Sequence, residues 1–166
     1  MRHWSVFLMI GAALSLVACG KSDTKTYTDD KGNSVSVTTN NGSGNDGHMT
    51  ITGSNGEKVE IGTGASAKMP SDLPLFPGAT VTASFSGQGK DGSGGMVAFH
   101  TKASPADVIA FYKQKAEASG MAQTAMMDMG GTQTYVAANE KQNRSVSVSV
   151  TKGSEGSDAQ ITWGTK

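Results

Sequence analysis

Few side chains in this sequence could take part in covalent or metal chemistry, and the single cysteine is the clearest of them. Cys19 lies between an uncharged, mostly apolar run at residues 4–18 and a polar stretch that begins at Gly20. One cysteine cannot form a disulfide within its own chain, so its thiol is either a small buried group or a site of modification. The residues in front of it favour modification.

Residues 1–18 have the organisation of a secretory signal. Arg2 supplies a positive charge, and the apolar run that follows has 15 residues, fewer than the roughly 20 that a membrane-spanning helix needs. The run ends in Leu16-Val17-Ala18-Cys19, which resembles the lipobox of bacterial lipoproteins. The resemblance implies that the Cys19 thiol receives a diacylglyceryl group, that residues 1–18 are removed, and that the new amino terminus is acylated. Several acyl chains on one residue give stable membrane attachment.

Location and partners follow from the same region and from the charge. Lipoproteins of the inner membrane resemble one another in having Asp after the lipidated cysteine, whereas this chain has Gly20, which favours the periplasmic face of the outer membrane. Cleavage would leave 148 of the 166 residues, and loss of Arg2 from 14 basic and 14 acidic residues gives a net charge of −1. Near-neutral charge without a basic run argues against nucleic acid as a partner. The expected partner is the membrane, through Cys19; the sequence identifies no protein partner.

Methionines are the other residues with ligand chemistry. Met126, Met127 and Met129 follow one another closely, and thioethers are soft ligands that select Cu(I). A site built on residues 121–129 would make the protein a binder of copper or of a small ligand. Under the competing interpretation, Met121, Met127 and Met129 share one strand face and fill the core beside a helix, while Met126 points the other way. We favour the core interpretation and expect no metal and no cofactor.

Motifs of catalysis or nucleotide binding are weak. GQGKDG at residues 87–92 matches GxGxxG, but a strand rather than a helix follows, which indicates a hairpin loop. GSGNDG at residues 42–47 is similar to one calcium-binding nonapeptide turn, but such sites need stacked copies, so a linker is favoured. His48 and His100 lie outside any recognisable catalytic or metal-ligand spacing. We therefore expect a non-enzymatic protein, with a hydrolase that lacks a familiar motif as the least favoured alternative.

The first part of the mature chain contains an internal repeat. KTYTDDKGNSVSVTT (residues 25–39) and MTITGSNGEKVEIGT (residues 49–63) align without gaps at an offset of 24 residues. Each copy predicts two short strands around a turn at Lys31-Gly32 or Asn55-Gly56. Because an isolated hairpin is marginally stable in water, the two hairpins either pair with each other or lie on the next domain.

Three prolines in residues 69–79 mark a stiff connector, and the patterns beyond it are stronger. We predict a signal peptide at 1–18, a lipid-anchored linker at 19–26, a two-hairpin segment at 27–66, a Pro-rich connector at 67–79 and an α+β domain at 80–166.

The last segment predicts an antiparallel sheet with one covering helix, in the order ββαββββ. The helix spans residues 104–120, with Ser104 as N-cap, Asp107 completing a capping box and Gly120 ending it. The strands after it are expected at 121–129, 132–139, 144–151 and 159–165, with a turn at 153–158. Valines and serines alternate at 145–150, which predicts one buried and one wet sheet face.

LPLFPGATV (residues 73–81) and TKASPADVIAFYKQKAEASG (residues 101–120) resemble segments of small uncharacterised lipoproteins of Gram-negative bacteria. This resemblance implies the domain boundary and the fold class, and no activity. We therefore expect a lipid-anchored, non-enzymatic protein of the outer membrane that acts through surface interactions.

Overall fold

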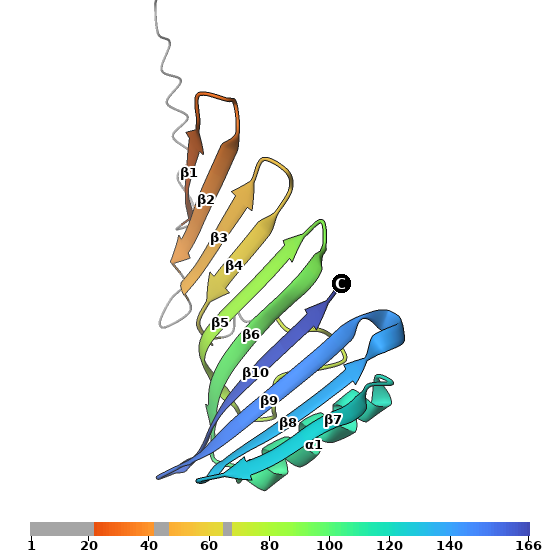
Figure 1. Cartoon of the computed structure of the whole chain (residues 1–166). Coiled ribbons are helices and arrows are strands. Elements are labelled where there is room, and N and C mark those ends of the chain that lie inside the picture. The colour runs from red at the N-terminus through yellow and green to blue at the C-terminus, as the bar shows by residue number, and fades with distance from the viewer. Residues whose placement is uncertain (1–21, 42–46, 65–67) are drawn as a thin grey trace, which may run out of the picture.

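The computed structural model describes residues 22–41, 47–64 and 68–166. These residues form one antiparallel sheet of ten strands in the order β1-β2-β3-β4-β5-β6-β10-β9-β8-β7, with one α-helix lying against one end of it (Figure 1). The strands are β1 Ser22–Thr28, β2 Ser34–Asn41, β3 Gly47–Gly53, β4 Lys58–Gly62, β5 Thr80–Gly89, β6 Gly92–Thr101, β7 Ala122–Met129, β8 Thr132–Asn139, β9 Arg144–Gly153 and β10 Gly156–Thr165. The helix is α1, Pro105–Ala118, and a short 3-10 helix, Glu140–Gln142, follows β8.

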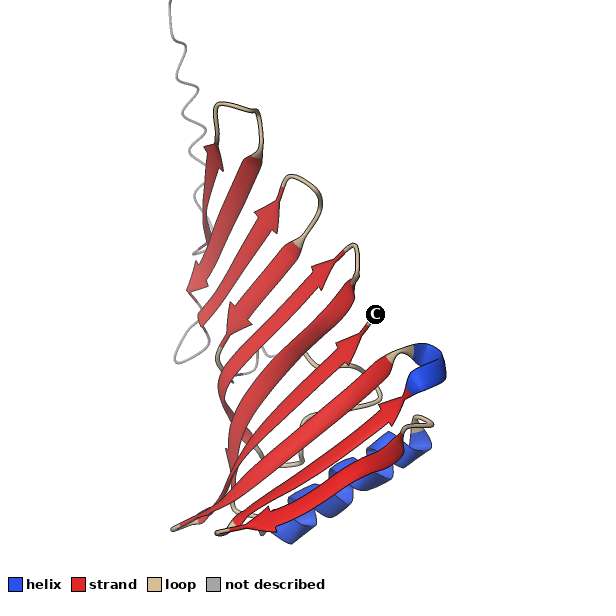
Figure 2. Cartoon of the chain, viewed as in Figure 1, coloured by secondary structure: helices blue, strands red, loops and turns tan. Residues whose placement is uncertain are grey.

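The predicted fold class, an antiparallel sheet with one covering helix, is confirmed, but the sheet is larger than expected. From Thr80 onward the elements follow as two strands, a helix and four strands. The two hairpins before them continue the same sheet, because β2 pairs with β3 and β4 pairs with β5 (Figure 2). Both options left open for the hairpins are therefore realised. β1 begins at Ser22, inside the range assigned to the linker.

The hairpins repeat each other in detail. In the first turn the amide of Asp29 donates to the carbonyl of Asn33 at 2.9 Å, and in the second the amide of Gly53 donates to Glu57 at 2.8 Å. These pairs are related by the same 24-residue offset as the sequences. Gly32 and Gly56 have φ angles of 81° and 79°, which side-chain-bearing residues rarely adopt. The predicted turns are thus present.

The hydrophobic core lies between α1 and the last strands of the sheet. Each large apolar side chain buried there contributes about 1.5–3 kcal/mol. Its members include Val97, Phe99, Tyr135, Val146, Val148, Val150 and Ile161 from the sheet, Val108, Ile109 and Tyr112 from the helix, and Leu73 from the segment before β5. We call the side of the sheet that carries α1 the helix face and the other side the open face.

The helix begins as the sequence predicts. The amide of Asp107 donates to Oγ of Ser104 at 3.2 Å, and the amide of Ser104 donates back to the Asp107 carboxylate at 3.4 Å, which completes the capping box. Pro105 occupies the first turn, where a missing amide hydrogen costs nothing. Gly120, with φ of 73°, follows the C-terminal cap.

The predicted position of two methionines was wrong. Met121 is buried, but Met127 and Met129 are 51% and 74% exposed. A register shift between Gln123 and Ala125 changes which alternate residues of β7 face the helix. Met127 therefore lies on the open face opposite Thr134, and Met126 lies on the helix face opposite Tyr135.

The predicted turn at 153–158 is shorter than expected. β9 continues to Gly153 and β10 begins at Gly156, so most of this polar run is strand. Ser157 is fully buried, and its hydroxyl donates to the carbonyl of Ala103 at 2.7 Å, in the loop that leads into α1, which offsets the cost of burying it. The hydroxyl thus has a partner that the local composition does not indicate.

Candidate ligand-binding cleft

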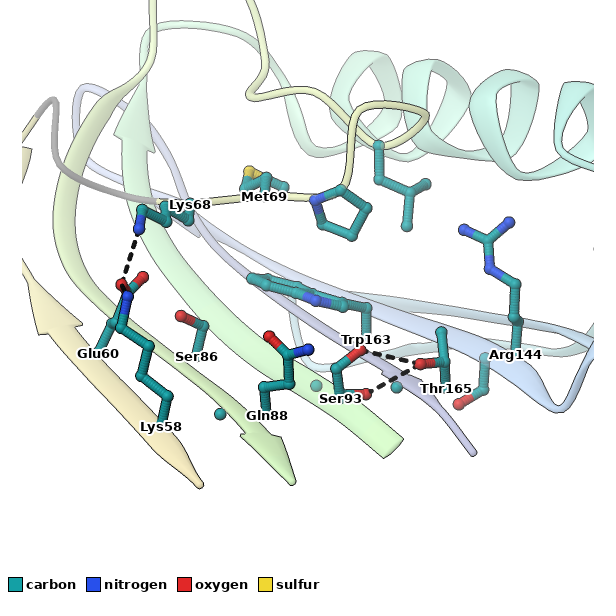
Figure 3. Close-up of a pocket in the computed structure, with 16 residues that line it drawn as sticks. Lys58, Glu60, Lys68, Met69, Ser86, Gln88, Ser93, Arg144, Trp163 and Thr165 are labelled. Carbon is teal, nitrogen blue, oxygen red and sulfur yellow. Dashed lines mark hydrogen bonds and ion pairs between the residues drawn. The ribbon is translucent and has the colours of Figure 1, made fainter. Parts of the chain in front are cut away.

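A cleft of about 440 Å³ lies on the helix face, beside the part of the sheet that α1 covers. Its floor is formed by strands β4, β5, β6, β9 and β10, and the connector before β5 lies over it (Figure 3). The side chains that line it include Lys58, Glu60, Lys68, Met69, Leu73, Ser86, Gln88, Ser93, Arg144, Trp163 and Thr165.

The indole of Trp163 forms the apolar part of the floor. Trp163 is paired with Gly95 of β6 and with Val146 of β9, so it continues the core side of the sheet toward the hairpins. A Cβ atom on Gly95 would lie 2.5 Å from Cζ2 of the indole and 2.6 Å from the carbonyl oxygen of Phe85. Glycine at this position therefore allows the ring to lie across β6, as Figure 3 shows.

The connector is held over the cleft from two sides. Leu73 is 1% exposed and belongs to the core cluster, and Met69 packs against the same cluster. The hydroxyl of Tyr112 on α1 donates to the carbonyl of Pro74 at 3.0 Å. Burial raises the pKa of Tyr112, so this donor keeps its proton. The connector is thus a packed layer, and the Pro-rich sequence stiffens it.

An ion-pair cluster closes the end of the cleft near the hairpins. Oε1 of Glu60 lies 2.6 Å from Nζ of Lys58 and 2.7 Å from Nζ of Lys68. The hydrogen bond from Lys58, followed by that from Lys68, lowers the pKa of Glu60 below its ordinary value. The Glu60 side chain is largely covered, whereas the side chains of Lys58 and Lys68 are 45% and 63% exposed. The cluster therefore presents two cations to solvent and holds one anion beneath them.

Arg144 lies at the opposite end of the cleft and pairs with Asp72 of the connector. Burial raises the pKa of Asp72, but hydrogen bonds from Arg144 and Ser119 outweigh it and leave the pKa below its usual value. The pair joins the connector to the start of β9. It therefore stabilises the covering layer as well as contributing a cation to the lining.

The lining combines an aromatic and aliphatic centre with polar ends. Trp163, Met69 and Leu73 offer apolar contact, and hydroxyl and amide groups from Ser86, Gln88, Ser93 and Thr165 border it. The lining has three cationic side chains and one carboxylate, and Asp72 pairs with Arg144 from the connector, so a net positive charge remains at the lysine end and favours an anion there. A concave, partly apolar site with a few convergent polar groups is the usual form of a small-molecule site.

The sequence-predicted site residues do not meet at this cleft. Cys19 and most of GSGNDG lie outside the described residues. GQGKDG forms the predicted hairpin, since β5 ends at Gly89 and β6 begins at Gly92. His100 lies on the open face with Nδ1 2.9 Å from the Asp158 carboxylate.

Neither a metal-binding cluster of carboxylate, imidazole or thiol groups nor a membrane-spanning helix is present in the described ranges. There, no three His, Cys, Asp or Glu side chains gather in a way that could hold a metal ion. Across those same ranges no helix has the length and hydropathy needed to cross a bilayer. Met126 and its neighbours Met127 and Met129 lie on opposite faces of β7, so their thioethers do not converge.

Sequence reasoning missed the cleft, although Trp163 falls within the final strand that it predicted at residues 159–165. Lys58 and Glu60 sit two residues apart, a spacing that puts both on one strand face. Gly94 and Gly95 are the only local sign that a bulky group crosses β6. Neither signal identifies β10 as the strand that pairs with β6, because Trp163 lies nearly 70 residues after Gly95 in the sequence.

Comparison with known proteins gives one similarity. A family model described as START domain-like matches residues 80–160, just under half of the chain. The match runs from the start of β5 through α1 and into β10, and it leaves out the hairpins and Trp163. No curated protein and no solved structure matches the chain.

Proposed function

We propose that this chain is a binding protein whose cleft takes a small amphipathic molecule with a flat apolar body and a negatively charged group. The observation that carries the proposal is the Trp163 indole, laid over Gly95 beneath the connector with cationic side chains at both ends. The apolar body would stack on the indole, and Lys58 and Lys68 would pair with the anion. The START domain-like match supports ligand binding as the class of function.

We further propose that the protein is non-enzymatic and is held by lipids on Cys19 at the periplasmic face of the outer membrane. The support is the lipobox-like sequence, the short apolar run before it and Gly20 after it. In the cleft, the Glu60 carboxylate is paired with two lysines and is therefore a poor general base. The groups present are suited to holding a ligand.

Copper or soft-metal binding by Met126, Met127 and Met129 is the second candidate. All three are exposed, at 48%, 51% and 74%, so their thioethers are accessible. Their division between two sheet faces argues against three ligands on one ion, because a single Cu(I) needs convergent sulfur atoms. The Trp163 cleft is therefore the favoured site.

The cleft proposal is tested with anilinonaphthalene sulfonate, a flat apolar anion, and the chain from residue 20 onward, which keeps every described residue. We expect saturable binding followed both by probe emission and by Trp163 emission. Replacing Lys58 and Lys68 by Gln should weaken binding about threefold to tenfold, because each exposed ion pair contributes only modestly. Circular dichroism checks that the sheet is retained.

The matched control replaces Lys113 and Lys152, two exposed lysines away from the cleft, by Gln. This variant removes the same net charge and should bind the probe as the parent chain does. Probe held on other apolar surfaces is affected equally in both variants, so only the difference between them is assigned to the cleft. Equal binding by both variants would rule out the cleft as the site.

A further inference from the structure

The two hairpins and the first strands after them carry an apolar patch on the open face. Cross-strand pairing places its members in rows: Met49, Ile61, Phe85 and Met96 in one, Val37, Ile51 and Val59 in the next, Tyr27 and Val35 in the third. Tyr27 is 62% exposed, and Ile61 and Phe85 are 43% and 45% exposed. Nothing in the described part of the chain packs over these three side chains.

The patch reverses the polarity seen at the other end of the sheet. There the helix face is apolar and the open face carries Ser147, Ser149 and Gln160. In the hairpins the helix face is polar, with Oγ1 of Thr24 and Thr38 2.9 Å apart. The apolar side chains thus lie on the helix face at one end of the sheet and on the open face at the other. The hydrophobic effect alone would not favour the exposed apolar residues of the open face in a chain surrounded by water.

The size of the patch argues against a second copy as its partner. Five strand spacings of about 4.8 Å and two or three side chains along each strand cover a few hundred Å². A stable protein interface buries about 800 Å² on each partner, roughly twice that area. A contact of this size is suited to a surface that is already held nearby by a tether.

A lipid anchor on Cys19 would hold the membrane surface close to the patch. β1 begins at Ser22, three residues beyond Cys19, and three extended residues span only about 10 Å. On β1 the open face carries Asp23, Lys25 and Tyr27. Tyr27 and Lys25 are side chains that settle at a membrane interface, with the ring in the headgroup region and the amine at the phosphates, while Asp23 lies at the end of the strand nearest Cys19. From β2 to β5 the patch rows contain no charged side chain.

We propose that the apolar patch lies on the lipid bilayer to which Cys19 is attached, so that the sheet rests on the membrane by its open face. This inference rests on the proposed lipid anchor. It has a consequence for the cleft, which is on the helix face: the cleft is directed away from the membrane, and its ligand enters from the aqueous side.

The test uses the full chain, processed and lipidated in cells and reconstituted into vesicles of phosphatidylethanolamine and phosphatidylglycerol. Because lipidation consumes the only native thiol, an introduced cysteine can be labelled alone with an environment-sensitive fluorophore. Tyr27→Cys and Met49→Cys place the label on the patch. Thr26→Cys and Thr50→Cys place it on the opposite face of the same strands, one residue away and equally far from the anchor.

Lipids with nitroxide groups on their acyl chains should quench the labels at positions 27 and 49 severalfold more than those at 26 and 50. Replacing Ile61 and Phe85 together by Ser should reduce quenching at position 27, since both are exposed and their loss leaves the core intact. Equal quenching on the two faces would refute the proposal. Labels protected from aqueous iodide, but unquenched by lipid, would show that a second copy covers the patch and would also refute it.

Vesicle flotation separates this result from a failure of the anchor. Protein that floats with vesicles but shows no difference between faces is anchored without docking. Protein that does not float lacks the anchor, and the docking proposal then fails with it.

Discussion

Gly95 and Trp163 lie opposite each other on β6 and β10, and the ring of the second occupies the space that a side chain on the first would need. A Cβ on Gly95 would lie 2.5 Å from Cζ2 of the indole and 2.6 Å from a backbone oxygen of β5, so a side chain there would require both the ring and the β5 backbone to move. The position of the Trp163 ring in the floor of the cleft therefore depends on a glycine at position 95 of the neighbouring strand, β6.

Gly95→Ala should displace the indole and reduce binding of anilinonaphthalene sulfonate. Overpacking of this kind costs about 1–3 kcal/mol, so the urea midpoint should also fall. Gly164→Ala is the control, because a Cβ there meets only Oγ of Ser145 at 3.9 Å. If both variants bind the probe and unfold alike, the ring does not lie where we place it.

Asp72→Asn should loosen the connector. Removing the pair with Arg144, whose members are about a quarter to a third exposed, should lower the free energy of unfolding at neutral pH by about 1 kcal/mol. The pKa of Asp72 is lower in the folded chain than its ordinary value of 3.8. The ionised carboxylate therefore adds to the free energy of unfolding at pH values above 3.8, and this stabilisation is lost as the pH falls through the folded pKa.

The difference in the free energy of unfolding between the parent and Asp72→Asn chains should therefore shrink as the pH falls below about 4. Urea denaturation over a pH series measures it. Asp91→Asn, in the exposed turn between β5 and β6, serves as the control for removing one carboxylate. A difference that stayed constant into acid would mean that Asp72 acts through packing rather than charge.

Replacing Met126, Met127 and Met129 together by Leu should change stability by less than about 0.5 kcal/mol per site, because all three are exposed. Titration of the parent chain with Cu(I) should show no saturable binding tighter than about micromolar. Tight one-to-one binding that disappears in the triple variant, with its circular dichroism unchanged, would replace the cleft by the methionine strand as the functional site.

Cys19→Ala should give an uncleaved or misprocessed precursor that no longer fractionates with the outer membrane, because the acyl chains have lost their attachment site. Immunoblots of sucrose-gradient fractions measure this, with Ser22→Ala as a neighbouring control. Processing and fractionation like those of the parent chain would contradict the lipoprotein hypothesis.

Local patterns in the sequence were enough for several elements. The capping box at Ser104 and Asp107 depends on residues three apart, and the turns at Gly32 and Gly56 depend on positive φ. These features involve neighbours along the chain, so residue type and spacing predict them directly.

Features that involve distant residues were missed or misplaced. Strict alternation placed Met127 and Met129 in the core, but a register shift at Gln123 and Ala125 moves them to the open face. The position of the extra residue depends on how β7 pairs with β8. The alternation of residue types along β7 alone therefore cannot predict it.

The sequence by itself determined that a helix covers part of an antiparallel sheet, that two repeated hairpins precede it, and that Cys19 follows a signal-like run. Only the tertiary structure decided that the hairpins extend the same sheet, with their apolar side chains on the opposite face from the core. It also decided that Trp163, Gly95 and Glu60 share one row across four strands. The physical reason is that backbone pairing between strands far apart in sequence sets which residues become neighbours, whereas propensities, caps and turns act only over a few residues.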